Sequence, residues 1–171
     1  MLGAAESGGQ ALQSTLKRWF LDGTHVGRID SAPRITALPE FIVPVMWLVF
    51  AGLIAGLTMK HARQDSSNRI PSICIVLCFV GLMLPPGWHH YFAFLPFVQL
   101  HLLQARPSKS SFGLLVLAIL IGRIPILSLG LLEHSYAIAS SFGATTLSTL
   151  LSWFAWINHL SSKNRKSNPD A

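Results

Sequence analysis

Two adjacent histidines lie in a proline-rich corner of this sequence, in the stretch LPPGWHHYFAFLP from Leu84 to Pro96. A neutral imidazole can give or take a proton near neutral pH with little tuning, so His89 and His90 are candidates for general acid-base chemistry. The competing interpretation is an aromatic belt at a membrane interface, in which the histidines are polar neighbours of Trp88 and Tyr91.

Arg123 is the second candidate, because it lies within the apolar run Phe112–Leu132, two residues before Pro125. A charge at the centre of a membrane-spanning helix costs ~2.5–3.5 kcal/mol, so we expect its side chain to face protein or water and to meet an anion. Glu133 would lie ~15 Å further along the same helix, which is too far to pair with it. We therefore expect the anion to come from a missing segment, another chain or a ligand phosphate.

Other chemistry-bearing residues are sparse. His101 and His90 would be about three turns apart on one helix, too far to share a metal ion, and a haem would need ligands from other segments. Cys74 and Cys78 lie inside an apolar run and are interpreted as small buried side chains. No glycine-rich phosphate loop, Ser-His-Asp order or carboxylate pair is present. The sequence therefore predicts no metal site and no cofactor.

The composition indicates which class of protein must position these residues. Of the 171 residues, 51% are hydrophobic and 12% are charged, and the mean hydropathy is +0.48. These values are typical of a membrane protein. The net charge of +6 could suggest a nucleic-acid partner, but the basic residues lie in short gaps between apolar runs and not on an amphipathic face. We expect membrane lipids as partners and no nucleic acid.

The apolar runs predict an all-α, polytopic membrane protein with about five transmembrane helices. They cover Phe41–Met59, Ile70–Leu84, Tyr91–Ala105, Phe112–Leu132 and Ala137–Leu160. A span needs ~20 residues, so the first, fourth and fifth runs are long enough. The second and third have ~15 residues each, so the turn between them, which carries the histidines, should lie below the membrane surface beside protein or a water-filled cavity.

Basic residues alternate between the gaps. One set of gaps contains Lys60, Arg63, Arg69, Arg106, Lys109, Lys163, Arg165 and Lys166. The other set, at 85–90 and 133–136, contains no Lys or Arg. Because Lys and Arg in short loops stay on the cytoplasmic side, this pattern predicts an external N-terminus and a cytoplasmic C-terminus. We expect a multi-pass protein of the plasma (inner) membrane.

Three regions follow from this topology. Residues 1–38 should form a non-cytoplasmic helix and loop, residues 39–160 the five-span bundle, and residues 161–171 a basic cytoplasmic tail. In the first region, Gln10–Phe20 carries Leu12, Leu16, Trp19 and Phe20 on one helical stripe and is expected to lie in the outer interface. An external region that carries basic residues and has no signal peptide is expected to follow earlier spans, so we expect this chain to be the C-terminal part of a longer protein.

Two segments resemble glycosyltransferase family 87. LPPGWHHYFAFLPFVQLHLL resembles that family's Ser-Pro-x-x-Trp-x-His-His/Tyr region, and SGGQALQSTLKRWF resembles its Asn-Gln-Ser-Leu-x-x-x-Leu-x-Arg segment. Gln10, Leu12 and Arg18 stand in corresponding places, whereas Gly9 and Ala11 replace the usual asparagine and serine. The two segments come in the family's order and cover roughly residues 7–105.

The resemblance implies a GT-C enzyme that transfers a sugar, mannose or a related hexose, from a polyprenyl-phosphate donor on the non-cytoplasmic side. It implies catalytic or supporting roles for His89 and His90, and contacts with the substrate for Trp88, Gln10 and Arg18. Arg123, which lies outside the matched segments, is expected to contact the substrate because of its position within an apolar run. The catalytic aspartate of such enzymes lies in an N-terminal half that has no counterpart in residues 1–38. Two other classes stay open: a non-catalytic membrane subunit for assembly or lipid binding, and a transporter fragment, which would carry more polar residues within its spans.

Overall fold

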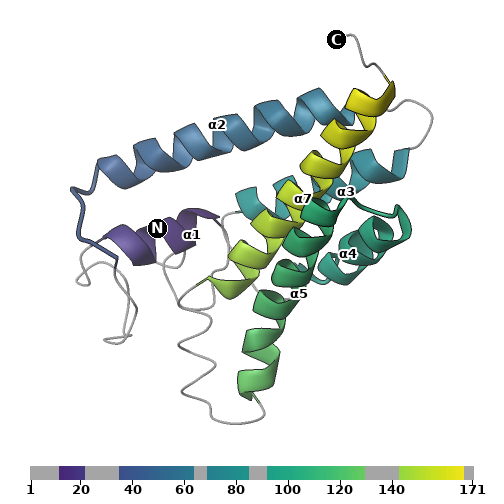
Figure 1. The fold of residues 1–171 in the computed structure, drawn as a ribbon. Helices are drawn as coiled ribbons and strands as arrows, with labels where there is room; N and C mark the ends of the chain where they lie inside the picture. The colour runs from purple at the N-terminus through teal and green to yellow at the C-terminus, as the bar shows by residue number, and fades with distance from the viewer. Residues whose placement is uncertain (1–11, 22–34, 64–68, 85–91, 130–142, 168–171) are drawn as a thin grey trace.

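The computed structural model describes residues 12–21, 35–63, 69–84, 92–129 and 143–167. These residues form six α-helices and no strand, so the all-α class is confirmed (Figure 1). The helices are α1 (Leu12–Phe20), α2 (Ile42–Ala62), α3 (Arg69–Met83), α4 (Leu95–Gln104), α5 (Lys109–Leu129) and α7 (Ala144–Ser167).

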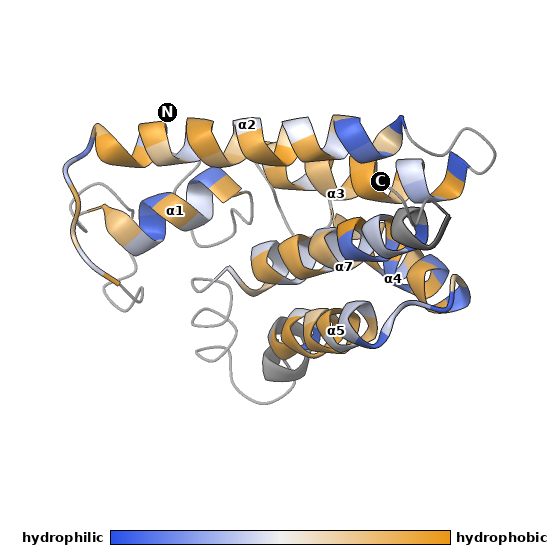
Figure 2. Cartoon of the chain, turned by 45° about the horizontal axis from the view of Figure 1, so that its top comes forward, coloured by the Kyte–Doolittle hydropathy of each residue, from blue (hydrophilic) through white to orange (hydrophobic). Residues whose placement is uncertain are grey.

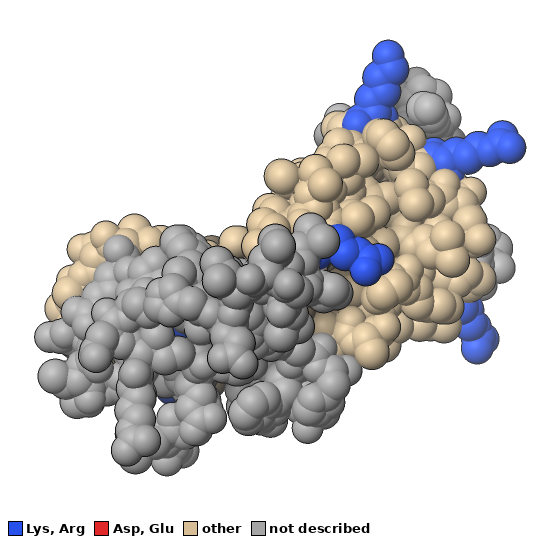
Figure 3. Space-filling view, turned by 90° about the horizontal axis from the view of Figure 1, so that it is seen from below, with Lys and Arg blue, Asp and Glu red and all other residues tan. Residues whose placement is uncertain are grey.

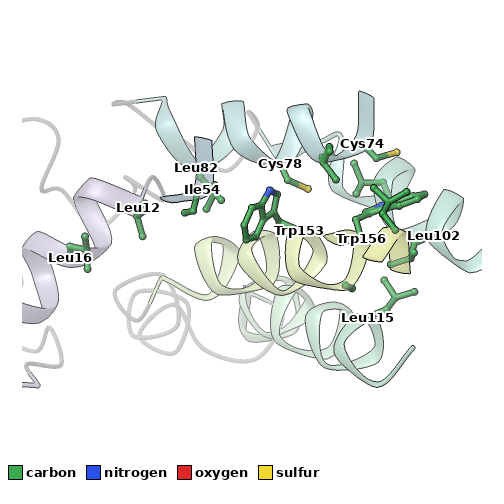
Figure 4. Close-up of a cluster of buried hydrophobic side chains, with 14 of the residues drawn as sticks. Leu12, Leu16, Ile54, Cys74, Cys78, Leu82, Leu102, Leu115, Trp153 and Trp156 are labelled. Atoms are coloured by element: carbon green, nitrogen blue, oxygen red, sulfur yellow. The ribbon is translucent and has the colours of Figure 1, made fainter. Parts of the chain in front are cut away.

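Helix α7 is the centre of the bundle, because α2, α3, α4 and α5 all pack against it. Its buried residues form two stripes at helical spacing. The first stripe is Thr146, Thr149, Trp153, Trp156 and Leu160, and the second is Ala144, Ser148, Ser152 and Ala155. Figure 4 shows Trp153 and Trp156 extending from α7 toward α3, where Cys74 and Cys78 lie. The two cysteines are free and fully buried, as small apolar residues would be.

Hydrogen bonds from α7 reach its neighbours inside this core. The Trp153 indole N–H donates to the Thr58 hydroxyl of α2 at 2.9 Å, and the Trp156 indole N–H donates to the Val98 carbonyl of α4 at 3.2 Å. The Gln99 amide of α4 donates to the Ser152 hydroxyl at 3.2 Å. These bonds satisfy polar groups that would otherwise be costly to bury.

Small residues bring α5 and α7 into close contact. The Ser148 hydroxyl donates to the Ala118 carbonyl at 2.7 Å, and a Cβ placed on Gly122 would lie only 2.7 Å from the Ser148 Oγ. Close approach at small side chains is the usual way in which helices associate where apolar burial alone offers little driving force, as in a bilayer.

The short helices α3 and α4 contact each other as the two legs of the predicted hairpin. The Phe94 ring, just before α4, lies within 2.7 Å of the position that a Cβ on Gly81 of α3 would occupy, so glycine is needed there. The turn that joins the legs lies outside the described residues.

Helix α2 covers the bundle on one side and exposes its other side. Its apolar residues continue around the helix, as Figure 2 shows in orange, and Val45, Leu48 and Leu53 are each more than half exposed. A Cβ on Gly52 or Gly56 would meet nothing within 4 Å. Of the described helices, α2 is the one that is long and apolar enough to cross a membrane.

The fifth apolar run differs most from expectation. The sequence predicts a span over Ala137–Leu160, whereas the described helix is Ala144–Ser167 and is too polar to qualify as a membrane span. Its polarity comes from Asn158 and His159 together with Ser and Thr residues, of which Ser148 and Ser152 bond to neighbouring helices. For α3 and α4 the expected shortness is confirmed at 15 and 10 residues.

Replacing Gly122 with leucine should separate α5 from α7. Because the new side chain would displace Ser148, we expect a loss of about 1–3 kcal/mol in the free energy of unfolding. Gly113→Leu is the matched control, since it lies on the same helix with nothing within 4 Å. The measurement is denaturant unfolding in detergent, and equal stability of the two variants would refute the close approach.

The bond from Trp153 to Thr58 should contribute measurably to stability. In a double-mutant cycle of Trp153→Phe and Thr58→Val, we expect a coupling energy of about 1 kcal/mol, the usual net value of a hydrogen bond. Unfolding of the wild type, both single variants and the double variant gives this number. A coupling near zero would mean that the indole N–H does not hold α7 to α2.

Candidate functional site

The structure describes two of the six predicted site residues. Arg18 lies on α1 and Arg123 on α5. Gln10, Trp88, His89 and His90 lie outside the described residues, so their predicted roles stay predictions.

Arg18 is buried, with 2% of its surface exposed, although α1 was expected to lie in the membrane interface. Leu12 and Leu16, on one side of α1, join the hydrophobic core, as their spacing predicts. Ser14, Thr15 and Arg18 lie on another side of the helix and are also buried. These three residues are called the α1 polar face below.

The α1 polar face meets the first turn of α7. The Arg18 Nη2 donates to the Thr15 Oγ1 at 3.3 Å, and the Thr15 Oγ1 lies 2.9 Å from the Thr146 Oγ1. Thr146 is the third residue of α7. Two hydrogen bonds, through the Thr15 hydroxyl, therefore link the Arg18 guanidinium to Thr146 in the first turn of α7.

Gly143 makes this contact possible. It precedes α7 with a φ of +70°, and its carbonyl accepts the first helical hydrogen bond, from the Leu147 N–H at 2.9 Å. A Cβ on Gly143 would lie 2.6 Å from the Thr15 Cγ2. Any larger residue would therefore be strained in its backbone and would push α1 away from α7.

Positive charge accumulates at this junction. Burial lowers the pKa of Arg18 to about 10, so the guanidinium is still protonated at neutral pH. The amino end of a helix carries a partial positive charge and unsatisfied N–H groups. A cation and a helix amino terminus side by side form an environment that favours an anion.

A further polar group on α1 also favours a polar ligand at this junction. The Ser14 Oγ is fully buried and has no hydrogen-bond partner among the residues that the structure describes, and Ser14 lies one helical turn before Arg18. A buried polar atom left unsatisfied costs free energy, which a bound ligand would recover. The Trp19 Nε1 of the same helix is a second buried donor without a partner.

Arg123 does not belong to this cluster. It is exposed on α5, one residue after the Gly122 that contacts α7, and it forms no hydrogen bond or ion pair with any residue that the structure describes. The expectation that its anion comes from outside this chain therefore stays a prediction.

The other histidine of interest, His101, packs edge-on against Phe97, with 4.3 Å between the ring centroids. Within the described ranges, no three His, Cys, Asp or Glu side chains gather in a way that could hold a metal ion.

Sequence reasoning identified Arg18 but missed Ser14, Thr15, Gly143 and Thr146. The available signal was weak. Ser14 and Thr15 stand one turn before Arg18, so they share its side of a helix, and Gly143 precedes two threonines at the start of an apolar run. Which partner these residues face could not be read from their spacing.

In comparisons with known proteins, no protein family, curated protein or solved structure matches the chain. The candidate site is therefore defined by its own geometry.

The buried charge predicts a pH dependence. Because the native pKa of Arg18 is lowered to about 10, the native state releases this proton before the unfolded chain does. At pH values between the native pKa of Arg18 and its higher pKa in the unfolded chain, the unfolded state binds more protons than the native state does. The contribution of Arg18 to the free energy of unfolding therefore rises with pH in this range. Relative to Arg18→Met, the wild type should gain stability from about pH 9 to about pH 11.5. A difference that does not change with pH would contradict a buried guanidinium.

Proposed function

We propose that this chain is the C-terminal membrane portion of a GT-C glycosyltransferase that transfers a hexose, such as mannose, from a polyprenyl-phosphate donor on the non-cytoplasmic side. The observation that carries the proposal is the α1 polar face, a buried cation beside a helix amino terminus. This arrangement suits the phosphate of such a donor. It coincides with the arginine that the family 87 resemblance assigns to the substrate.

Sugar transfer requires the protein to stabilise a departing phosphate and to accept a proton. The bond between the sugar anomeric carbon and the phosphate oxygen breaks while the acceptor oxygen bonds to that carbon, and a base takes the acceptor's proton. Arg18 and the first turn of α7 would stabilise the charge that develops on the departing phosphate. His89 and His90 would support proton transfer or phosphate binding, and the aspartate base would come from the N-terminal half of a longer protein.

The arrangement of the helices supports the proposed sidedness. Helices α2 and α7 both run from the α1 side of the molecule to the side where Lys60, Arg63, Arg69, Arg106, Lys109 and Lys163 gather, called the basic end below. Thr146 and Lys163 are ~26 Å apart along α7, close to the thickness of a hydrocarbon core. A multi-pass protein of the plasma membrane with α1 outside and the basic end in the cytoplasm agrees with this separation.

The test is sugar transfer in membranes that contain the full-length polypeptide and a radiolabelled polyprenyl-phosphate-mannose donor. Arg18→Gln should lower the transfer rate about 100-fold or more, as expected for loss of a group that stabilises developing charge. Lys17→Gln, a partly exposed neighbour on α1, is the control and should transfer normally. His89→Ala and His90→Ala should each lower the rate.

Normal transfer by Arg18→Gln, with the protein folded as judged by protease resistance, would overturn the role of Arg18. Normal transfer by both histidine variants as well would favour the rival function.

That rival is a non-catalytic membrane subunit for assembly or lipid binding, and one observation favours it. The side of α2 that carries Gly52 and Gly56 is uncovered, and nothing lies within 4 Å of either position. Closely spaced glycines let a second transmembrane helix approach. A subunit of this kind would lose its partner on Gly52→Ile while Arg18→Gln had no effect.

A further inference from the structure

A groove of about 550 Å³ lies at the basic end, where α2 ends and α3 begins. Ala62 and Arg63, at the carboxyl end of α2, form one side, and five residues of α3 form the other. Figure 2 shows these two helix ends next to each other. The Ser72 hydroxyl of α3 donates to the Ala62 carbonyl at 3.0 Å. This contact joins the two walls of the groove, which is called the α2–α3 groove below.

The charge of the α2–α3 groove is positive. Arg63 and Arg69 both line it, and no acidic residue is among its described lining residues. Both side chains are exposed, and neither forms a hydrogen bond or ion pair with any residue that the structure describes. The sequence from Lys60 to Arg69 has three basic residues and one acidic residue, Asp65, so its net charge is positive even with Asp65 counted. Figure 3 likewise shows Lys and Arg, and no Asp or Glu, on the described surface seen from below.

The helix ends beside the groove do not cancel this charge. The carboxyl end of a helix carries partial negative charge on carbonyls that lack a partner, which disfavours an anion. In α2, however, the Met59 carbonyl accepts the Arg63 N–H at 3.3 Å, and the Ala62 carbonyl accepts the Ser72 hydroxyl. On the other wall, Arg69 is the first residue of α3, at the end of that helix where the partial charge is positive.

The α3 wall changes from charged to apolar along the helix. Arg69, Ser72, Ile73, Val76 and Leu77 line the groove at positions i, i+3, i+4, i+7 and i+8, which form one face of a helix. This face is ~12 Å long. Ile73 and Val76 are 49% and 40% exposed, so apolar surface stays open beside the charged end. A ligand that fits the whole groove therefore has an anionic group at one end and a hydrocarbon chain at the other.

The position of the groove on α2 favours a lipid over a soluble anion. Helix α2 is long and apolar enough to cross a membrane, and its 21 residues measure ~32 Å against ~30 Å for the hydrocarbon core. If α2 crosses the bilayer, Ala62 ends the span and Arg63 lies at the level of the phospholipid headgroups. Basic pockets between helices at this level bind anionic headgroups.

We infer that the α2–α3 groove binds an anionic phospholipid. The headgroup phosphate contacts Arg63 and Arg69, whose planar guanidinium groups match a phosphate in geometry and charge. An acyl chain covers Ile73 and Val76. A soluble phosphate would leave this apolar wall uncovered, and a zwitterionic headgroup would bring a cation of its own toward the arginines. The site lies at the opposite end of α2 from α1 and does not depend on sugar transfer (Figure 1).

The experiment counts bound lipids by native mass spectrometry of the purified full chain in a neutral detergent. The probes are dioctanoyl phosphatidylglycerol, dioctanoyl phosphatidylcholine, which has the same acyl chains, and inorganic phosphate. We expect phosphatidylglycerol to bind about tenfold or more tightly than either of the others, the combined effect of two cations. Arg63→Gln and Arg69→Gln should each weaken its binding about fivefold, because a basic residue near an anionic lipid contributes about 1 kcal/mol.

Two controls are matched to these variants. Lys109→Gln removes a charge from the basic end at a residue that does not line the groove, and the affinity should change less than about twofold. Val76→Asn places a polar group on the apolar wall and should weaken phosphatidylglycerol binding severalfold. Val80→Asn should bind normally, because Val80 lies one turn further along α3, is 42% exposed and does not line the groove.

The inference is overturned if phosphatidylcholine or inorganic phosphate binds as tightly as phosphatidylglycerol. It is also overturned if both arginine variants bind like the wild type, if Lys109→Gln weakens binding as much as they do, or if the two valine variants lose equal affinity. Arg18→Gln should leave this binding intact, so failure here is distinct from failure of the proposed glycosyl transfer.

Discussion

The hydrogen bonds that leave α7 are the constraint on which the rest of the structure depends. Hydroxyl and indole groups of this one helix bond to α1, α2, α4 and α5. Each of these bonds satisfies polar groups that would be costly to bury without a partner, and a typical bond of this kind contributes about 0.5–1.5 kcal/mol to stability. Ser148 is an example, because its hydroxyl bonds to the Ala118 carbonyl and also occupies the space beside Gly122. The polarity of α7 that separates it from an ordinary span is therefore what orders the bundle.

The same helix explains where the candidate anion site lies. Its amino end meets the α1 polar face, so partial positive charge is added to that of Arg18. Its carboxyl end carries Lys163, a cation where the helix dipole favours one, beside the amino end of α5. The two ends of α7 lie on opposite sides of the core to which Trp153 and Trp156 contribute.

Much of the fold could be predicted from the sequence, because apolar runs and gaps are one-dimensional signals. The predicted run Ile70–Leu84 became Arg69–Met83, and the charges of the gaps predicted which loops would share an end. The ends of α7 could not be predicted, because Ser and Thr interrupt an apolar run. Only the structure shows that they face neighbouring helices. The candidate site was predictable only as Arg18. That this arginine is buried depends on Thr15 meeting Thr146, residues 131 positions apart, and no spacing rule encodes that contact.

Burial decides how the two predicted arginines differ. In the sequence, Arg123 has a reason to meet an anion because it lies within an apolar run, whereas Arg18 is singled out by the family 87 resemblance. The structure separates them, because Arg18 is enclosed with a fixed hydroxyl and a helix amino terminus, whereas Arg123 is exposed on the outside of α5. An enclosed cation has a position fixed before any ligand arrives, so little ordering entropy is lost when a phosphate binds. An exposed one must first be ordered by its partner. Preorganisation therefore supports the proposed role of Arg18 in holding a phosphate, whereas Arg123 would need a partner from outside the described residues to fix its position.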